Sequence, residues 1–453
     1  MKRFSNSALK WLVSILKERF GYDFSLEQND NSLVLLLADD REGSIVFPNL
    51  TNEFMRAASD LPCTEWDFYD GGWHRPLGKP LTAPGFSTLT SPLIEKQDSS
   101  YIVHYDVLGL VYWMLNRIEE IDRTDLDKHG RFPAVNSHAY VHGYLERPVV
   151  DEWLHILGQI IEMQWPHLAL KEHKFQIKVS HDVDMPSRYG FRSMKGMIRG
   201  VLGDILVRKN FKSAFIAPWI RLTTKNKIHN KDPFNTFNWI MDQSEKNELK
   251  SAFYFICGRT DFQKDADYEI EHPAIRELMR TIHFRGHEIG LHPSYNSYLN
   301  PSALLNESMR LKKVMQEEGI DQVGVGGRMH YLRWSHPETL QSWNEASMTY
   351  DSTLGYADKS GFRCGTCFEY PGFNSISQEQ LSIRIRPLIV MDITVISDDY
   401  EGLGLGSEVN EKILFIKKNC QKVSGTFTVL WHNNTLTSSS EKSVYINAIN
   451  NNE

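Results

Sequence analysis

The chain has 453 residues, 41% of them hydrophobic and 24% charged, a balance that is ordinary for a globular protein of two or three domains. Lys and Arg number 50 and Asp and Glu 57, so the net charge of −7 gives no global argument for nucleic-acid binding. Five scattered cysteines are not a disulfide framework and indicate a reducing compartment. We find no signal peptide and no apolar run of the roughly 18 residues that span a bilayer, and we expect a cytoplasmic location.

The first part of the chain, residues 1–165, predicts a small α+β domain. A short amphipathic helix is expected near the N-terminus, where Lys10 interrupts an apolar run. Leu33–Leu37 and Ser44–Phe47 are short apolar runs that suit strands. Residues 60–100 are rich in Gly, Pro, Ser and Thr and indicate loops.

Two further helices complete this predicted domain. Apolar side chains recur at helical spacing over residues 107–118 and again over 149–161, after a Pro148 that suits the first helical turn. We place the end of the domain at the Trp165–Pro166 step.

From residue 174 apolar runs alternate with helical stretches, which predicts that residues 172–453 form an α/β domain. Polar and reactive residues follow several of these runs. In barrels and open α/β sheets, functional sites are built where strands end in this way. The candidate strands are Phe175–Val179, Ala252–Ile256, His287–Leu291, Val323–Val325, Ile383–Ile385, Val390–Val395 and Thr426–Trp431.

Two carboxylates, Asp182 and Asp184, stand two residues apart at the end of the first of these strands. If the strand geometry persists, both project from one face, so that one could bind a metal while the other takes a proton. The alternative is a turn in which an aspartate caps a helix. The spacing alone does not choose between these readings.

Histidines follow two other candidate strands. The stretch Gly286–Leu291 leads into His292, and Asn296 lies four residues on, which one helical turn would place on the same face as a ligand pair. The run Val429–Trp431 ends in His432. A further motif, Gly-Gly-Arg-Met-His-Tyr, spans residues 326–331, and each of these patterns is weak alone.

Together and in this order, the motifs resemble the polysaccharide deacetylase family, carbohydrate esterase family 4, over residues 174–435. Ser251–Phe255 is similar to the family's second core strand, and Gly286–His292 to the approach to its first metal-binding histidine. The resemblance implies a distorted (β/α) barrel of the polysaccharide deacetylase type and one divalent metal ion, zinc. It also implies removal of an acyl group, such as acetyl, from a sugar or glycan precursor.

Carried over to this chain, the resemblance makes Asp182 the general base, His432 the general acid and Arg328 the side chain that holds the base. Asp184 and His292 become metal ligands, with Asn296 where the family usually has a second histidine. An amide oxygen is a weaker zinc ligand than imidazole, so this substitution predicts a looser site. The implied substrate-binding residues are Tyr331, His330 (where the family has proline), Val429, Leu430 and Trp431.

Two other functions stay open at this point. One is hydrolysis of another C–N bond, such as the formyl group of an amino sugar. The other is a glycan-binding module that kept the fold and lost tight metal binding, which the amide of Asn296 would allow. Asp127–Pro133 and Leu145–Pro148 resemble an uncharacterised N-terminal domain that is fused to such deacetylases in bacterial surface-glycan clusters.

The segment Arg188–Lys231 is strongly basic, with 11 Lys or Arg and a single acid, Asp204. Apolar residues recur at helical spacing between Met194 and Leu206. One interpretation is a solvated helix that packs on the barrel. The other is a basic amphipathic insert that makes peripheral contact with a membrane or an anionic substrate.

Cys364 and Cys367 form a CxxC pair without the second pair that a zinc ribbon needs. Gly361 and Gly365 indicate a loop rather than the strand and helix of a redox motif. We expect a structural or incidental role for both cysteines.

Overall fold

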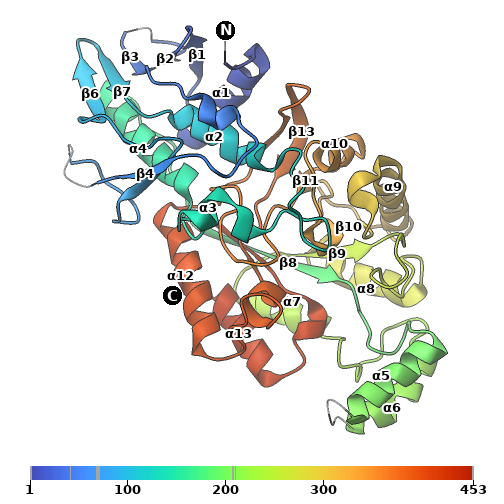
Figure 1. Ribbon diagram of the computed structural model, residues 1–453. Helices are drawn as coiled ribbons and strands as arrows, with labels where there is room; N and C mark the ends of the chain where they lie inside the picture. Colours follow the sequence, from blue (N-terminus) through green and yellow to red (C-terminus); the bar gives the residue numbers. More distant parts are fainter. Residues whose placement is uncertain (1–2, 41, 68–71, 207–208, 210, 451–453) are drawn as a thin grey trace.

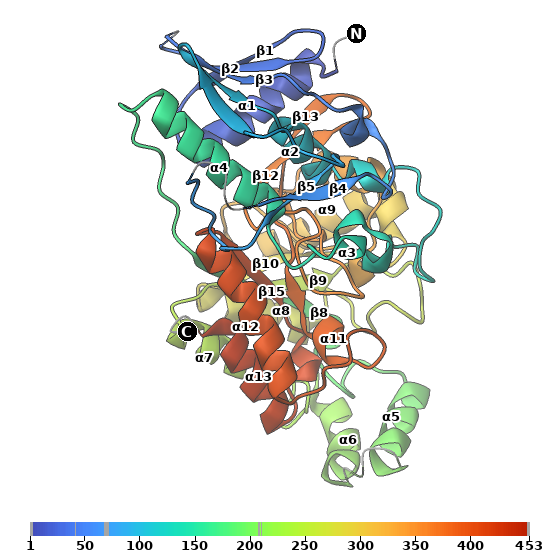
Figure 2. The same cartoon turned by 60° about the vertical axis from the view of Figure 1, so that its left-hand side comes forward.

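The computed structural model describes residues 3–40, 42–67, 72–206, 209 and 211–450. It has a mixed α/β architecture with several sheets, in which an N-terminal part lies against a larger C-terminal part (Figure 1). Two helices near residue 200 stand away from both parts in the two views (Figures 1 and 2). None of the described helices is both long enough and apolar enough to cross a bilayer.

The N-terminal part is built on a five-stranded sheet of order β1-β2-β3-β7-β6, with a separate β4-β5 pair. Its helix α1 begins where the Ser5 hydroxyl accepts from the amide of Ala8, and it ends at Gly21, whose φ of 84° suits glycine. The elements are α1 (Asn6–Phe20), β1 (Phe24–Gln28), β2 (Leu33–Leu37), β3 (Ser44–Phe47), β4 (Cys63–Trp66), β5 (Leu81–Pro84), β6 (Ile94–Gln97), β7 (Ser100–Val103), α2 (Val107–Leu115), α3 (His138–Val141) and α4 (Val149–Gln164).

Several sequence predictions for this part are confirmed, and one is wrong. Strands β2 and β3 have the predicted bounds, and α1, α2 and α4 lie where the apolar spacing placed helices. Residues 60–100 are not loops throughout, because β4, β5 and β6 form there. Strand β5 is buried along its whole length, so tertiary packing outweighs its weak local β propensity.

The C-terminal part holds a five-stranded parallel sheet of order β10-β9-β8-β15-β14 and a three-stranded sheet of order β11-β13-β12. Its elements are β8 (Gln176–Val183), α5 (Met194–Leu206), α6 (Phe211–Thr223), α7 (Phe237–Lys246), β9 (Ser251–Ile256), α8 (Pro273–Phe284), β10 (Glu288–His292), α9 (Pro301–Glu317), α10 (Glu338–Glu345), β11 (Tyr350–Asp351), β12 (Tyr370–Asn374), β13 (Glu379–Ile385), β14 (Val390–Met391), α11 (Asp392–Ile396), α12 (Ser407–Lys422), β15 (Thr426–Leu430) and α13 (Ser439–Ile449).

Single bridges connect these two sheets. Gly327 pairs in parallel with Leu291 on one side and with Asp351 on the other. The segment from β13 to β14 pairs with β11 near Arg384 and with β15 near Val390. The predicted α/β class is therefore present, but the ladders of the described strands do not by themselves make a continuous closed barrel.

Two predicted strands of this part are corrected. Val323–Val325 is not a strand: Val323 is fully exposed and Gly324 has a φ of 81°, so the chain turns before it meets the sheet at Gly327. The predicted strand Val390–Val395 ends at Met391 and continues as α11. Cys364 and Cys367 lie in a buried loop, as expected, and burial raises the pKa of both thiols.

The two parts of the chain share one hydrophobic core. Helix α1 lies against β12 and β13, and its Trp11 Nε1 donates to the carbonyl oxygen of Pro371 at 2.8 Å. The buried guanidinium of Arg363 donates to Glu120 at 2.5 and 3.0 Å across the same boundary. The N-terminal part is thus a packed component of the molecule.

Candidate metal and catalytic centre

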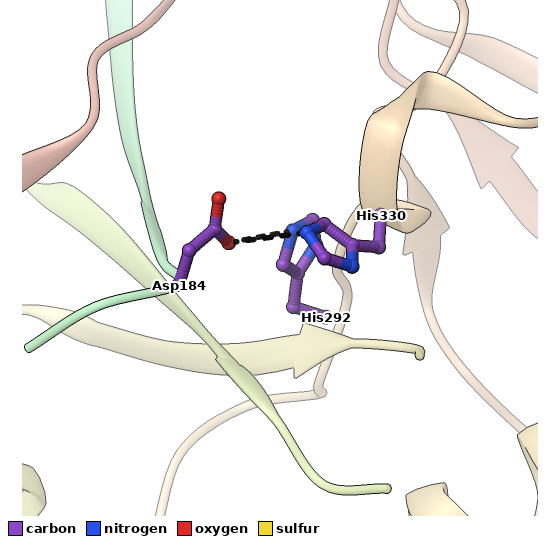
Figure 3. Close-up of side chains that lie close together, drawn as sticks. All are labelled: Asp184, His292 and His330. Carbon is purple, nitrogen blue, oxygen red and sulfur yellow. Dashed lines mark ion pairs between the residues drawn. The ribbon is translucent and has the colours of Figure 1, made fainter. Parts of the chain in front are cut away.

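Three potential metal ligands converge where the parallel strands end. Asp184 directly follows β8, His292 is the last residue of β10, and His330 begins a short 3-10 helix, η5 (His330–Leu332). One ligand atom from each side chain lies within 4.8 Å of the others. Figure 3 shows both imidazole rings facing the Asp184 carboxylate.

The Asp184 carboxylate is the centre of this group. Its Oδ1 atom lies 3.2 Å from His292 Nε2 and 3.7 Å from His330 Nε2, but it is buried without a hydrogen-bond partner. Burial raises the pKa of Asp184, but the neighbouring His330 and His292 outweigh it and hold the pKa well below the usual value. Asp184 is therefore an ionised carboxylate whose Oδ1 atom could bind a cation.

Both histidines are fixed through the ring nitrogen that points away from Asp184. Nδ1 of His292 donates to the backbone oxygen of Arg328 at 2.6 Å, and Nδ1 of His330 donates to Asp265 Oδ1 at 3.1 Å. Bonds of this kind fix the tautomer that leaves Nε2 available to a metal ion. Burial lowers the pKa of His330, but Asp184 and Asp265 outweigh it and raise the pKa to about 9, so a metal ion that binds Nε2 would have to displace a proton from it.

Asp182 lies beside this group and is held by Arg328. The fully buried guanidinium donates through Nη1 to Asp182 Oδ1 at 2.9 Å, while its other nitrogens bind Ser180 and Ser352. Oδ2 of Asp182 lies 3.7 Å from His292 Nε2. Asp182 thus has one oxygen fixed by Arg328, and its other oxygen lies near His292 of the Asp184 group.

His432 lies near the other oxygen of the Asp184 carboxylate. Its Nε2 lies 3.7 Å from Asp184 Oδ2, and its Nδ1 donates to Asp392 Oδ1 at 2.8 Å. Asp392 is fully buried and also accepts from the His432 backbone amide and the Thr435 hydroxyl. Burial lowers the pKa of His432, but Asp392 outweighs it and raises the pKa to about 10, so the ring carries a proton at neutral pH.

Asn296, the third ligand expected from the sequence, lies outside the group. The chain after His292 runs as a loop instead of one helical turn, and Asn296 is exposed. Its side-chain amide donates to the Thr260 oxygen at 3.1 Å, and its Oδ1 accepts from Arg333 at 3.0 Å. Both ends of the Asn296 amide are thus occupied by the protein.

The other expected substrate-binding residues divide into two sets. Tyr331 is partly exposed, adopts a φ of 61° and has its ring 4.7 Å from that of His330. Val429, Leu430 and Trp431, which precede His432, are fully buried, so none of them is exposed to solvent at the site.

A loop from the N-terminal part borders the same site. The ring of His129 lies 4.9 Å from that of Tyr331, and Arg131 donates to the Tyr331 backbone oxygen at 2.9 Å. Arg333 in turn donates to the backbone oxygen of His129 at 2.7 Å. The motif Asp127–Pro133 therefore helps to fix the backbone at Tyr331.

Asp265 and Asp392 were not expected as site residues. The sequence does carry a signal for Asp392 as a site residue, since it follows the apolar pair Val390–Met391 at the end of β14, as Asp184 follows β8. Asp265 had none, because it sits in a loop between β9 and α8 and reaches His330 only in the folded chain.

A cavity of about 420 Å³ lies elsewhere, between α1, α4 and the start of β8. Four of its charged side chains bind one another: Lys178 pairs with Glu369 at 2.5 Å and Arg384 with Glu18 at 2.8 Å. We assign no catalytic role to it, because it has neither the histidines nor the free carboxylate oxygen of the Asp184 group.

Residues 5–166 match a family of unknown function, DUF7033. Among curated proteins, none matches the sequence.

Three solved structures show weak similarity. One, described as a polysaccharide deacetylase from Mycobacterium smegmatis, is 13% identical, with a TM-score of 0.37 over 62% of this chain and 84% of that one. The Puue allantoinase is 10% identical, with a TM-score of 0.37 over 61% and 83%. Another, described as a polysaccharide deacetylase from Pseudomonas aeruginosa PAO1, is 10% identical, with a TM-score of 0.35 over 61% and 84%.

Proposed function

We propose that this protein is a metal-dependent hydrolase that removes an acyl group from a sugar or glycan precursor. The observation that carries the proposal is the convergence at one carboxylate of two oriented imidazoles, an arginine-held aspartate and a histidine that is hydrogen-bonded to Asp392. These groups are the parts of a hydrolytic site in which water attacks a carbonyl group. The residue motifs and their order favour an acylated sugar as the substrate.

The residues present fit a divalent metal ion. Asp184, His292 and His330 would hold it, because the buried Oδ1 of Asp184 lacks a hydrogen-bond partner and both Nε2 atoms face it. Our ligand set therefore has His330 in place of Asn296. Two imidazoles and one carboxylate suit zinc, with a coordination position left open for water or substrate. Bound there, the ion would polarise the acyl carbonyl group and lower the pKa of water.

Asp182 and His432 accept and donate the protons of the reaction. Asp182 takes a proton from the attacking water through the oxygen that faces the metal-binding group, while Arg328 fixes its other oxygen. His432 gives a proton from Nε2 to the leaving nitrogen or oxygen, since Asp392 keeps the ring oriented and its pKa high. The reaction releases the free acid and the deacylated sugar.

Metal analysis and product release test the proposal. The purified protein is analysed for bound zinc and incubated with N-acetylated, O-acetylated and N-formylated sugars while the released acid is measured. We expect His292→Ala to lose metal and turnover, and Asp182→Asn to keep metal and lose turnover. The control His167→Ala changes a histidine whose side chain is 59% exposed and should change neither. Full metal occupancy in His292→Ala, or no acid released from any substrate, would overturn the proposal.

A further inference from the structure

Helices α5 and α6 carry an exposed apolar surface that no described part of the chain covers. Eight large apolar side chains on them are half-exposed or more, from 50% for Leu202 to 91% for Phe215. Scattered apolar residues on a surface need no explanation, but a group of this size marks an interaction site. The eight are Met194, Ile198, Leu202, Leu206, Phe211, Phe215, Trp219 and Leu222.

The exposed residues follow the helical repeat. In α5 they recur every four residues from Met194 to Leu206, and in α6 they include Phe211, Phe215 and Trp219 at the same spacing. Other faces of the two helices pack together around Met197, Ala217 and Ile220. Each helix therefore has one apolar stripe for its partner helix and a second that faces outward.

The position of the pair explains why this outer stripe stays uncovered. Figures 1 and 2 both show α5 and α6 standing away from the sheets. The chain leaves and re-enters the body where Asp232 accepts from the Ser187 hydroxyl and the Arg188 amide. The α5–α6 pair thus projects from the C-terminal part and does not pack along its sheets.

The charge of the pair is strongly one-sided. The single acid of residues 188–231, Asp204, is buried and paired with Arg188 and Tyr189. Exposed basic residues include Lys195, Arg199, Lys209, Lys225 and Lys227. Any partner of this surface has to be apolar in part and negatively charged around that part.

We propose that the α5–α6 pair attaches this protein to an anionic lipid membrane. The apolar stripe enters the boundary between headgroups and acyl chains, and the basic residues bind the anionic headgroups. Each helix has 13 residues, or about 20 Å, and is shorter than the roughly 30 Å hydrocarbon core, so the pair lies in the interface. A second copy of the chain is a poorer occupant, because it would bring two basic surfaces together.

Attachment through the α5–α6 pair would also orient the molecule on the membrane. The pair follows β8, and Met194 lies ten residues after Asp184 (194 − 184 = 10). The strand end that bears the Asp184 group is therefore the end tethered to the membrane. The proposal concerns binding only and holds whether or not the site is catalytic.

Co-sedimentation of the full-length protein with vesicles tests the apolar contribution. The vesicles are phosphatidylcholine alone or mixed with phosphatidylglycerol. We expect binding to the mixed vesicles, weakened roughly tenfold or more for each change in Phe215→Ser and Trp219→Ser. The matched control is Phe284→Ser, since Phe284 on α8 is also 91% exposed. An equal loss of vesicle binding in the control, or unchanged binding in both Phe215→Ser and Trp219→Ser, would overturn the proposal.

The charge contribution is tested separately. Replacing Lys195 and Arg199 with Gln should weaken binding roughly fivefold per residue, and added salt should do the same to the unchanged protein. Lys10→Gln with Lys418→Gln, two exposed basic residues elsewhere, is the matched control. Tighter binding to neutral than to anionic vesicles would contradict the proposal.

Sedimentation velocity without lipid tests the competing occupant, a second copy of the chain. If α5 and α6 bind a second copy, the unchanged protein will be a dimer that Phe215→Ser converts to a monomer, and vesicles will not bind it. That outcome would replace the membrane with a protein partner. Thermal unfolding of each variant shows whether lost binding reflects lost folding, and we expect equal midpoints.

Discussion

Two regions of this molecule reverse the usual distribution of polar and apolar side chains. Around Asp184 the protein buries carboxylates, imidazoles and a guanidinium, whereas on α5 and α6 it exposes large apolar side chains. Buried polar groups and exposed apolar surface are each costly unless another molecule or another residue compensates for them. Both regions therefore point to ligands, but of opposite chemistry.

The two regions differ in what compensates for their unusual side chains. In the centre most polar groups have a partner inside the protein, and the Asp184 Oδ1 atom, which the two imidazoles face, has none. On the helix pair no described residue covers the outer stripe. We therefore expect changes in the centre to alter chemistry and stability together, and changes on the helix pair to alter binding alone.

The largest expected effect is on catalysis. His432→Gln removes the proton donor and should lower turnover on the order of 10²–10⁴-fold, with metal content unchanged. Asp392→Asn should lower turnover less, because His432 keeps its place but loses the carboxylate that raises its pKa. Single-turnover rates and metal analysis of both variants measure this. Loss of metal in His432→Gln would show that His432 is a ligand instead.

Folding stability sharpens the contrast between the regions. Arg328→Met leaves Asp182 buried without its cation and should cost about 3–5 kcal/mol in the free energy of unfolding. Phe215→Ser should change it by less than about 0.5 kcal/mol, as an exposed position does. Urea denaturation of both variants gives the two values. A comparable loss in Phe215→Ser would mean that the outer stripe is part of the folded core.

Metal affinity tests whether the hydrogen bond from His330 to Asp265 orients a metal ligand. Asp265→Asn weakens the acceptor that orients His330 and should lower metal affinity about 10–100-fold. Asn296→Ala should leave affinity unchanged, since its amide binds Thr260 and Arg333. Competition with a chelator measures both. The reverse order of effects would restore Asn296 as the ligand.

Acid should destabilise the protein through histidines outside the centre. Burial lowers the pKa of His138 and of His336 from 6.5 to about 4 in the folded chain. Between these values protons bind the unfolded chain first, so stability present above pH 6.5 is lost progressively as the pH falls toward 4. Urea denaturation at pH 7 and pH 5 checks the direction, and His138→Gln should reduce the difference.

Much of the local structure follows from sequence alone. The runs Leu33–Leu37 and Ser44–Phe47 are strands because they are short, apolar and bounded by polar residues. Strands β4 and β5 could not be predicted, since they pair with each other from positions far apart in the sequence and β5 is stabilised by burial. Strand β6 is exposed except at Ile94 and pairs with the adjacent β7, so it lacks the apolar run that marks a strand in the sequence. The Val323–Val325 run shows the reverse error, an apolar stretch that tertiary structure leaves outside the sheet.

The centre shows the same limit at the level of single residues. Asp182, Asp184, His292 and His432 come together because parallel strands end at one edge of a sheet, which sequence order can reveal. The choice of His330 over Asn296 depends on the path of two loops after their strands. No spacing rule encodes that path, because the bond that His330 donates to Asp265 fixes its ring, and bonds with Thr260 and Arg333 hold Asn296 away.

The contact between α1 and the last strands of the C-terminal part limits how this protein can be divided. Trp11 lies over Phe373, with ring centres 5.5 Å apart, and seals one face of β12. A gene fragment encoding only residues 172–453 would leave that face open to solvent in every newly made chain. We expect such a fragment to aggregate on expression, so the two parts can be exchanged between related genes only as a matched set.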